Sequence, residues 1–122
     1  MTTSQQIEQV LMMNGFRVIS IPKGLNRKKY DEWLSDHSCF ATYVRELRLY
    51  VPGHNKPFRF DWGNPYKKIA IEFEGGAYSG GGHVRGKKYT LDCLKYNEAQ
   101  LQGWKVFRFT CRSGFTSIIE RI

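Results

Sequence analysis

The chain has 122 residues, and its 41% hydrophobic and 15% aromatic content is that of one folded domain, not of a disordered chain. The formal charge of +8 at pH 7 favours a polyanionic partner, with nucleic acid as the first candidate. The sequence has no apolar run of about 18 residues, no basic and apolar leader and no Cys-x-x-Cys spacing, so we expect a cytoplasmic protein with reduced thiols and no membrane contact.

The first 21 residues predict a helix followed by a strand. Residues 2–14 carry apolar side chains at helical spacing, with Thr3 or Ser4 as the N-cap and Gly15 after the last turn. Residues 16–21 are rich in β-branched and aromatic side chains, which favours a strand.

A second helix is predicted at residues 26–35, with Asn26 as its cap. Its first turn holds three basic residues: Arg27, Lys28 and Lys29. Positive charge is unfavourable at the N-terminal end of a helix, so this cluster indicates contact with a polyanion, and a solvated surface turn is the alternative explanation. Residues 1–40 thus form an N-terminal helical segment that is either an accessory DNA-contacting element or the first part of the core.

Three strands are expected to follow as an antiparallel meander. Alternating apolar residues predict strands at 43–51, 57–62 and 67–74, and the first of these begins the expected sheet. Pro-Gly-His-Asn separates the first two strands, and the run 63–65, Gly-Asn-Pro, predicts the turn between the second and the third.

The last third of the chain predicts a helix, a strand and a short C-terminal helix. The apolar side of the helix at 88–102 carries Leu91, Leu94, Tyr96, Ala99 and Leu101. Because this helix connects the strands at 67–74 and 104–110, those strands should be parallel. Residues 113–122 predict the short helix. The expected fold class is therefore α/β, a mixed sheet flanked by helices.

Acidic side chains gather around the expected hairpin. Glu72 and Glu74 lie two residues apart on one strand and share a face, and Asp61 comes alongside them on the neighbouring strand. Carboxylates that lie close together repel each other, and a divalent cation is the usual reason to keep them together. These three side chains therefore predict a site for Mg²⁺ or Mn²⁺, and Glu46 on the preceding strand is a further candidate ligand.

Residues 75–86, directly after the carboxylates, hold six of the twelve glycines. Such a loop is flexible or brings its backbone close to a ligand, and the helix that follows presents its N-terminal amides. Basic side chains gather at the same place: His83, Arg85, Lys87 and Lys88. We expect them to contact the phosphates of a nucleic acid.

These motifs resemble the core of the PD-(D/E)xK nucleases. The resemblance consists of Asp61, a hairpin, and Glu72-Phe73-Glu74 followed by Gly-Gly. Residues 72–110 add the glycine-rich segment, a helix with Asp and Lys, and Gly-Trp-Lys-Val before the last strand. They are similar to a group of small phage-encoded endonucleases and, more distantly, to the very-short-patch-repair endonucleases. The resemblance implies a restriction-endonuclease-like core at residues 43–112, within a single nuclease domain of residues 1–122.

The resemblance also implies a set of site residues. It assigns the metal to Asp61, Glu72, the Phe73 backbone carbonyl and Glu74. The sequence departs from the family motif at Phe60, where the motif has proline, and at Glu74, where it has lysine. A lysine from the following helix, Lys95 or else Lys88, would replace the motif lysine; a surface pair with Asp92 is the alternative explanation for Lys95. The expected catalytic residues are Asp61, Glu72, Glu74 and Lys95.

Three functions are compatible with these patterns. The first is an Mg²⁺- or Mn²⁺-dependent DNA endonuclease that nicks or cuts structured DNA in phage DNA metabolism, in the host cytoplasm if it is phage-encoded, and as a homodimer if it cuts both strands. The second is a catalytically inactive protein of the same fold that binds nucleic acid by charge, which Glu74 in the lysine position suggests. The third, supported by size and charge alone, is a small RNA-binding or ribosome-associated protein.

Overall fold

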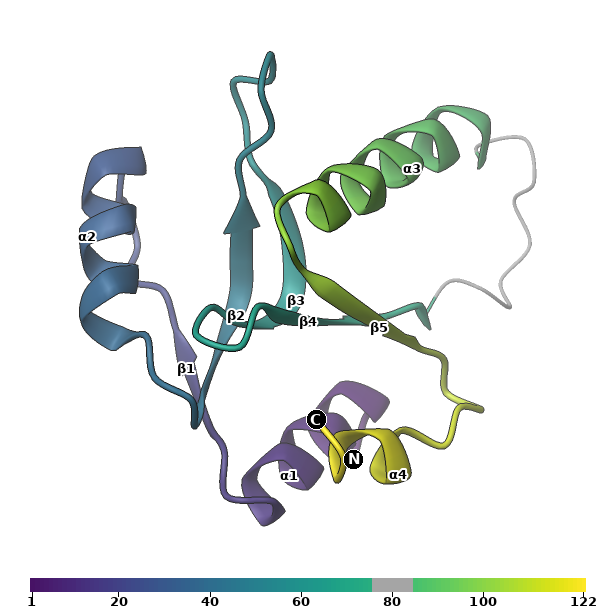
Figure 1. Cartoon of the computed structure of the whole chain (residues 1–122). Helices are drawn as coiled ribbons and strands as arrows, with labels where there is room; N and C mark the ends of the chain where they lie inside the picture. The colour runs from purple at the N-terminus through teal and green to yellow at the C-terminus, as the bar shows by residue number, and fades with distance from the viewer. Residues whose placement is uncertain (76–84) are drawn as a thin grey trace.

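The computed structural model describes residues 1–75 and 85–122 as a five-stranded mixed sheet flanked by helices (Figure 1). The strands are β1 (Arg17–Ser20), β2 (Thr42–Leu49), β3 (Phe58–Asn64), β4 (Ile69–Phe73) and β5 (Lys105–Phe109). The helices are α1 (Thr3–Met13), α2 (Arg27–His37), α3 (Arg85–Leu101) and α4 (Phe115–Ile119). Within the described ranges, no helix is long and apolar enough to cross a membrane.

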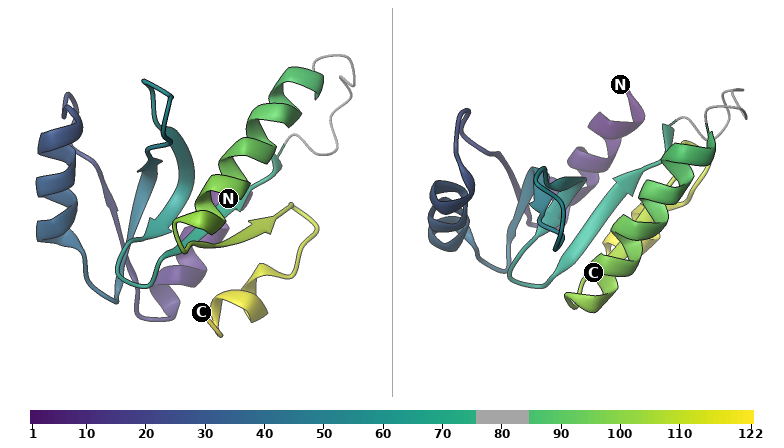
Figure 2. Two further views of the ribbon diagram at one scale, coloured as in Figure 1. Left: turned by 45° about the horizontal axis from the view of Figure 1, so that its top comes forward. Right: turned by 90° about the horizontal axis from the view of Figure 1, so that it is seen from above.

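The strands lie side by side in the order of the sequence, β1-β2-β3-β4-β5. The pairs β2–β3 and β3–β4 are antiparallel, and the outer pairs β1–β2 and β4–β5 are parallel. Each parallel pair is joined through a crossover helix, α2 or α3, and these two helices lie on either side of the β2–β3 hairpin (Figure 2). The predicted meander and the parallel last strand are confirmed.

Two apolar clusters join the helices to the sheet, one with α1 and α4 and the other with α2 and α3. The first joins α1 and α4 to the sheet and contains Ile7, Leu11, Tyr43, Trp62, Ile69, Ile71, Phe109 and Ile119. The second contains Val44, Leu47, Leu49, Val51, Phe60, Ala70 and Ala99, against which α2 packs through Trp33 and Leu34. Each large side chain fully buried in this way contributes about 1.5–3 kcal/mol, and together these contributions fix the sheet between the helices.

The N-terminal segment is part of the sheet, because β1 pairs with the beginning of β2. The prediction that the sheet begins with the strand at residue 43 was therefore wrong, because β1 precedes that strand in the same sheet. Glu8 of α1 ties this part together: its carboxylate accepts two hydrogen bonds from Arg45, at 2.7 and 2.8 Å, and one of 2.8 Å from Trp62 Nε1. The N-cap of α1 is Thr2, not Thr3 or Ser4, because Thr2 and Gln5 exchange hydrogen bonds in a capping box.

The turn between β3 and β4 also differs from the prediction. Gly63 and Asn64 belong to β3, and the turn occupies residues 65–68. The buried side chain of Asn64 donates to the Phe40 carbonyl at 2.8 Å and accepts from the Lys67 amide at 3.0 Å. Asn64 thus organises the turn from the end of the strand, which is why a turn-forming residue type occurs at a sheet position.

Candidate active site

Asp61 and Glu72 lie together where β3 and β4 stop pairing. The ladder between the strands runs from Asn64–Ile69 to Trp62–Ile71, and side chains provide the next hydrogen bonds. The Asp61 amide donates to Glu72 Oε1 at 3.3 Å, and the Phe73 amide donates to Asp61 Oδ2 at 2.7 Å. Each carboxylate therefore caps a backbone amide of the other strand, and this reciprocal contact holds the two acidic groups side by side.

Lys95 of α3 completes this cluster. Its ammonium Nζ donates to Glu72 Oε1 at 2.8 Å and lies 4.7 Å from the centre of the Phe60 ring. Burial raises the pKa of Glu72, the Lys95 contact lowers it, and the charge of Asp61 raises it again, with a net increase. The proton affinity of Glu72 is thus increased even though it is paired with a cation.

The position of Lys95 corrects the expected packing of α3. Lys95 and Ala99 are buried against the sheet, whereas Leu91 is 41% and Leu101 83% exposed. Lys95 pairs with Glu72 and not with a residue of its own helix, so a surface pair with Asp92 does not form. A lysine on the buried face of a helix is unusual. Its contact with Glu72 therefore indicates why α3 turns this face toward the sheet.

Glu74 lies one residue beyond β4 and is held apart from the other two carboxylates. Its Oε1 accepts from Arg108 Nε at 2.8 Å and from the Tyr96 hydroxyl at 3.1 Å, and the Arg108 guanidinium lies 4.4 Å from the centre of the Tyr96 ring. Burial, and then the charges of Glu72 and Glu74, raise the pKa of Tyr96, so its hydroxyl remains a donor. Neither partner of Glu74 was identified from the sequence, although the parallel register of β4 and β5, which places Arg108 beside Glu72, could have revealed Arg108.

In the described ranges 1–75 and 85–122, no three acidic, histidine or cysteine side chains are grouped to hold a metal. The pair of carboxylates nevertheless offers suitable oxygens. Asp61 Oδ1 and Glu72 Oε2 receive no hydrogen bond from residues 1–75 or 86–122. The N–H and C=O of a strand residue point the same way, so the Phe73 carbonyl faces the Asp61 side. Such an all-oxygen donor set fits Mg²⁺ or Mn²⁺. Glu46 is exposed and lines a groove beside β1 instead of joining this cluster.

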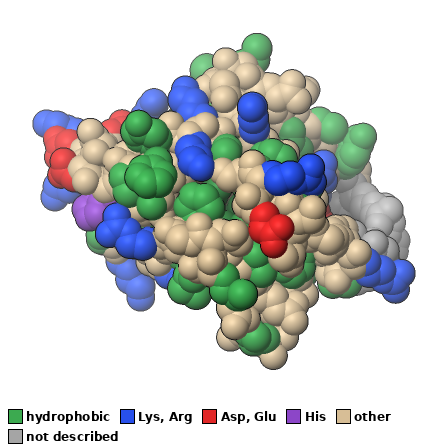
Figure 3. All heavy atoms as spheres, turned by 60° about the horizontal axis from the view of Figure 1, so that its bottom comes forward, with side chains coloured by type: hydrophobic (Ala, Val, Ile, Leu, Met, Phe, Trp, Pro, Cys, Tyr) green, Lys and Arg blue, Asp and Glu red, His purple; other side chains and the backbone are tan. Residues whose placement is uncertain are grey.

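The predicted phosphate-contacting residues fall into two separate groups. Arg27, Lys28 and Lys29 are exposed in the first turn of α2, and Lys87 and Lys88 are exposed in the first turn of α3. The two helices lie on opposite sides of the β2–β3 hairpin (Figure 2). Arg85 is the first residue of α3, and His83 lies outside the described residues. Basic side chains are spread widely over the face shown in Figure 3, where acidic ones gather in few places.

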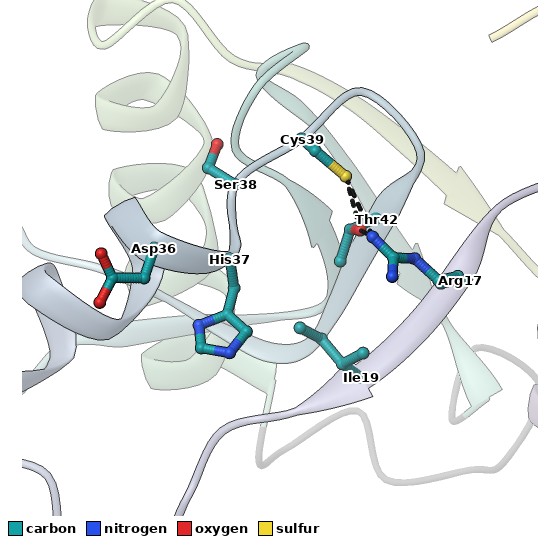
Figure 4. A pocket seen from close by; sticks show the side chains of 7 residues that line it. All are labelled: Arg17, Ile19, Asp36, His37, Ser38, Cys39 and Thr42. Atoms are coloured by element: carbon teal, nitrogen blue, oxygen red, sulfur yellow. Dashed lines mark hydrogen bonds between the residues drawn. The ribbon is translucent and has the colours of Figure 1, made fainter.

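A pocket separate from this cluster lies beside Cys39, just after the end of α2 (Figure 4). The Cys39 sulfur lies 2.9 Å from Thr42 Oγ1 and accepts from Arg17 Nη2 at 3.4 Å. Hydrogen bonding by Thr42, and then by backbone and Arg17 donors, lowers the pKa of this thiol. His37, whose Nδ1 lies 2.7 Å from the Trp33 carbonyl, points away from the sulfur, so the pocket does not form a cysteine–histidine pair.

Comparisons of the chain with protein-family models, with curated proteins and with solved structures found no match. The chemistry of Asp61, Glu72 and Lys95 therefore provides the main indication of function.

Proposed function

We propose that the protein is a metal-dependent DNA endonuclease that hydrolyses phosphodiester bonds, with a restriction-endonuclease-like core of the PD-(D/E)xK type. The observation that carries this proposal is the cluster of Asp61, Glu72 and Lys95 at the divergence of two strands. It contains the two acidic groups and the basic group of the motif, with the lysine supplied from α3. Because the charges of two neighbouring carboxylates repel each other, their arrangement by reciprocal hydrogen bonds, with Glu72 buried, favours a functional role.

The residues that would hold Mg²⁺ or Mn²⁺ are Asp61, Glu72 and the Phe73 carbonyl. A bound divalent cation would offset charge on the phosphate and lower the pKa of a water ligand. The Phe73 amide fixes Asp61 Oδ2, which leaves the other oxygen of this carboxylate for ligation. Lys95 fixes Glu72 Oε1 in the same manner, so both carboxylates are oriented before a ligand arrives.

Lys95 also provides positive charge for the reacting group. Its ammonium is buried and its position is fixed by Glu72 and the Phe60 ring, so a phosphate that reaches this cluster would meet an oriented donor with little reorganisation. Glu74, held by Arg108 and Tyr96, would orient these two side chains beside the site. Exposed Lys87 and Lys88 at the start of α3 would bind neighbouring phosphates.

The resemblance to phage-encoded endonucleases suggests a role in phage DNA metabolism in the host cytoplasm. Cleavage of both strands would require a second copy or a second encounter. An inactive protein that binds nucleic acid is the second candidate, because Lys95 already forms an ion pair with Glu72.

A cleavage panel tests the proposal. Duplex, nicked, flap, four-way-junction and single-stranded DNA, and RNA, are each incubated with Mg²⁺, with Mn²⁺ and with chelator. We expect metal-dependent cleavage of at least one DNA, and a rate about 100-fold or more lower for Glu72→Gln. Glu120→Gln removes the same charge from the exposed residue that caps the C-terminus of α4 and should cleave at the wild-type rate. Binding without cleavage of any substrate would instead support the second candidate.

A further inference from the structure

A basic groove lies between the chain that leaves β1 and the β2–β3 hairpin. It has a volume of about 410 Å³ and is lined by Ser20, Ile21, Pro22, Lys23, Gly24, Arg45, Glu46, Arg48 and Arg59. None of its basic residues was predicted from the sequence to contact a ligand. The groove shares strand β3 with the candidate active site, since Arg59 and Asp61 both belong to this strand.

Two arginines of the groove face each other across the hairpin. Arg48 and Arg59 are direct partners in the β2–β3 register. Like charges at such positions destabilise a sheet, and no carboxylate in the described ranges lies within ion-pair distance of either guanidinium. The pair therefore has an electrostatic cost that an anionic ligand would relieve.

Arg48 is held in position before any ligand binds. Its Nη1 donates to the Leu25 carbonyl at 2.9 Å and to the Tyr50 hydroxyl at 3.3 Å, and its guanidinium lies 4.7 Å from the centre of the Tyr30 ring. The guanidinium of Arg27 lies over the ring of Tyr50, 4.4 Å from its centre. Tyr50 thus contacts both Arg48 of the groove and Arg27 in the first turn of α2.

Most of the positive charge in the groove has no acidic partner. Of its basic residues, Arg45 is paired with Glu8, whereas Lys23, Arg48 and Arg59 form no ion pair with the described residues. Glu46 is the one acidic side chain among those that line the groove. Lys23 and Arg59 are exposed and can turn toward a ligand. This combination of a guanidinium held by hydrogen bonds and two exposed cations suits a row of phosphates.

We propose that this groove binds the sugar-phosphate backbone of the nucleic acid, with Lys23, Arg48 and Arg59 as phosphate contacts. The identity of the partner rests on the proposed function, but binding in the groove does not depend on cleavage. Arg59 precedes Asp61 by two residues, which is roughly 7 Å along a strand.

The test is the affinity of a fluorescent oligonucleotide, measured by anisotropy in chelator across a salt series. Arg59→Gln and Lys23→Gln should each weaken binding severalfold and reduce the slope of log K against log salt by about one, and the double variant should reduce it by about two. Arg121→Gln removes an exposed arginine that follows α4 and serves as the control. We expect the control to bind as wild type does.

Three results would overturn the groove assignment: no binding by the wild type, groove variants that bind as tightly as Arg121→Gln, or an effect of Arg59→Gln seen only with anionic lipid vesicles or polyglutamate. The proposed function is tested separately from the groove assignment. If Glu72→Gln cleaves DNA at the full rate while the groove variants lose affinity, the active-site assignment is wrong and the groove assignment stands.

Discussion

The ammonium of Lys95 lies 2.8 Å from Glu72 Oε1, and the two side chains are only 9% and 12% exposed. Removing one member of a buried pair leaves the other charge without compensation. We expect Lys95→Met to lower the free energy of unfolding by about 3–5 kcal/mol at pH 7, and Glu72→Gln/Lys95→Met to recover part of it. Urea unfolding measures both, with exposed Lys105→Met as the control.

The destabilisation of Lys95→Met should depend on pH. The pKa of Glu72 is already raised by burial, and loss of Lys95 raises it further. The pKa of Glu72 in the folded variant is then higher than the unfolded value of 4.5. The free energy of unfolding therefore falls as pH rises from 4.5 through the folded-state pKa. Unfolding measured from pH 4 to pH 8 should show the deficit growing with pH; a constant deficit, or one within about 0.5 kcal/mol of the Lys105→Met control, would contradict this account.

Glu8 should have the opposite pH dependence. Hydrogen bonding by Arg45 lowers its pKa, so its stabilising effect is complete above the unfolded value of 4.5 and is lost as pH falls through the lower, folded pKa. Glu8→Gln should cost about 1–2 kcal/mol at pH 7, a figure reduced because Arg45 is partly exposed, and the cost should shrink below pH 4. Thermal unfolding of wild type and Glu8→Gln across this range is the measurement, and equal losses at pH 3 and pH 7 would be inconsistent with it.

Gly63 is required by close packing and not by a turn. A Cβ at this position would lie 2.6 Å from Leu47 Cδ2 and 2.9 Å from Leu47 Cβ. Gly63→Ala should therefore destabilise the protein by about 1–3 kcal/mol through overpacking. Gly114→Ala is the matched control, because its Cβ would meet nothing within 4 Å. A chemical denaturation midpoint for Gly63→Ala equal to that of Gly114→Ala would show that Leu47 can move aside.

The order and pairing of the strands could be predicted because they follow from periodicity and connection length. Alternating residues identified the meander, and a helix between two strands requires a parallel pair. The end of β3 was misplaced because Gly63 and Asn64, residue types common in turns, serve packing and side-chain hydrogen bonds here. Such uses depend on neighbours distant in sequence, which local patterns do not contain.

The candidate site was only partly accessible to sequence reasoning. The spacing placed Asp61 and Glu72 on paired strands, where the structure brings them together. The strand period put Glu74 on the same face as Glu72, but β4 ends at Phe73, and Arg108 with Tyr96 holds the Glu74 carboxylate. A strand's end and the partner of a charged group are decided by tertiary packing, so the distribution of the three carboxylates could not be derived from spacing.

The most direct test of the central claim, that Asp61 and Glu72 hold a catalytic divalent cation, is a Mn²⁺ titration followed by electron paramagnetic resonance of the free ion, with and without a duplex oligonucleotide. We predict that wild type and Glu120→Gln remove Mn²⁺ from the free pool, and that Asp61→Asn and Glu72→Gln leave the ion free. Wild type that leaves all Mn²⁺ free under both conditions, or Asp61→Asn that binds it as wild type does, would contradict the account.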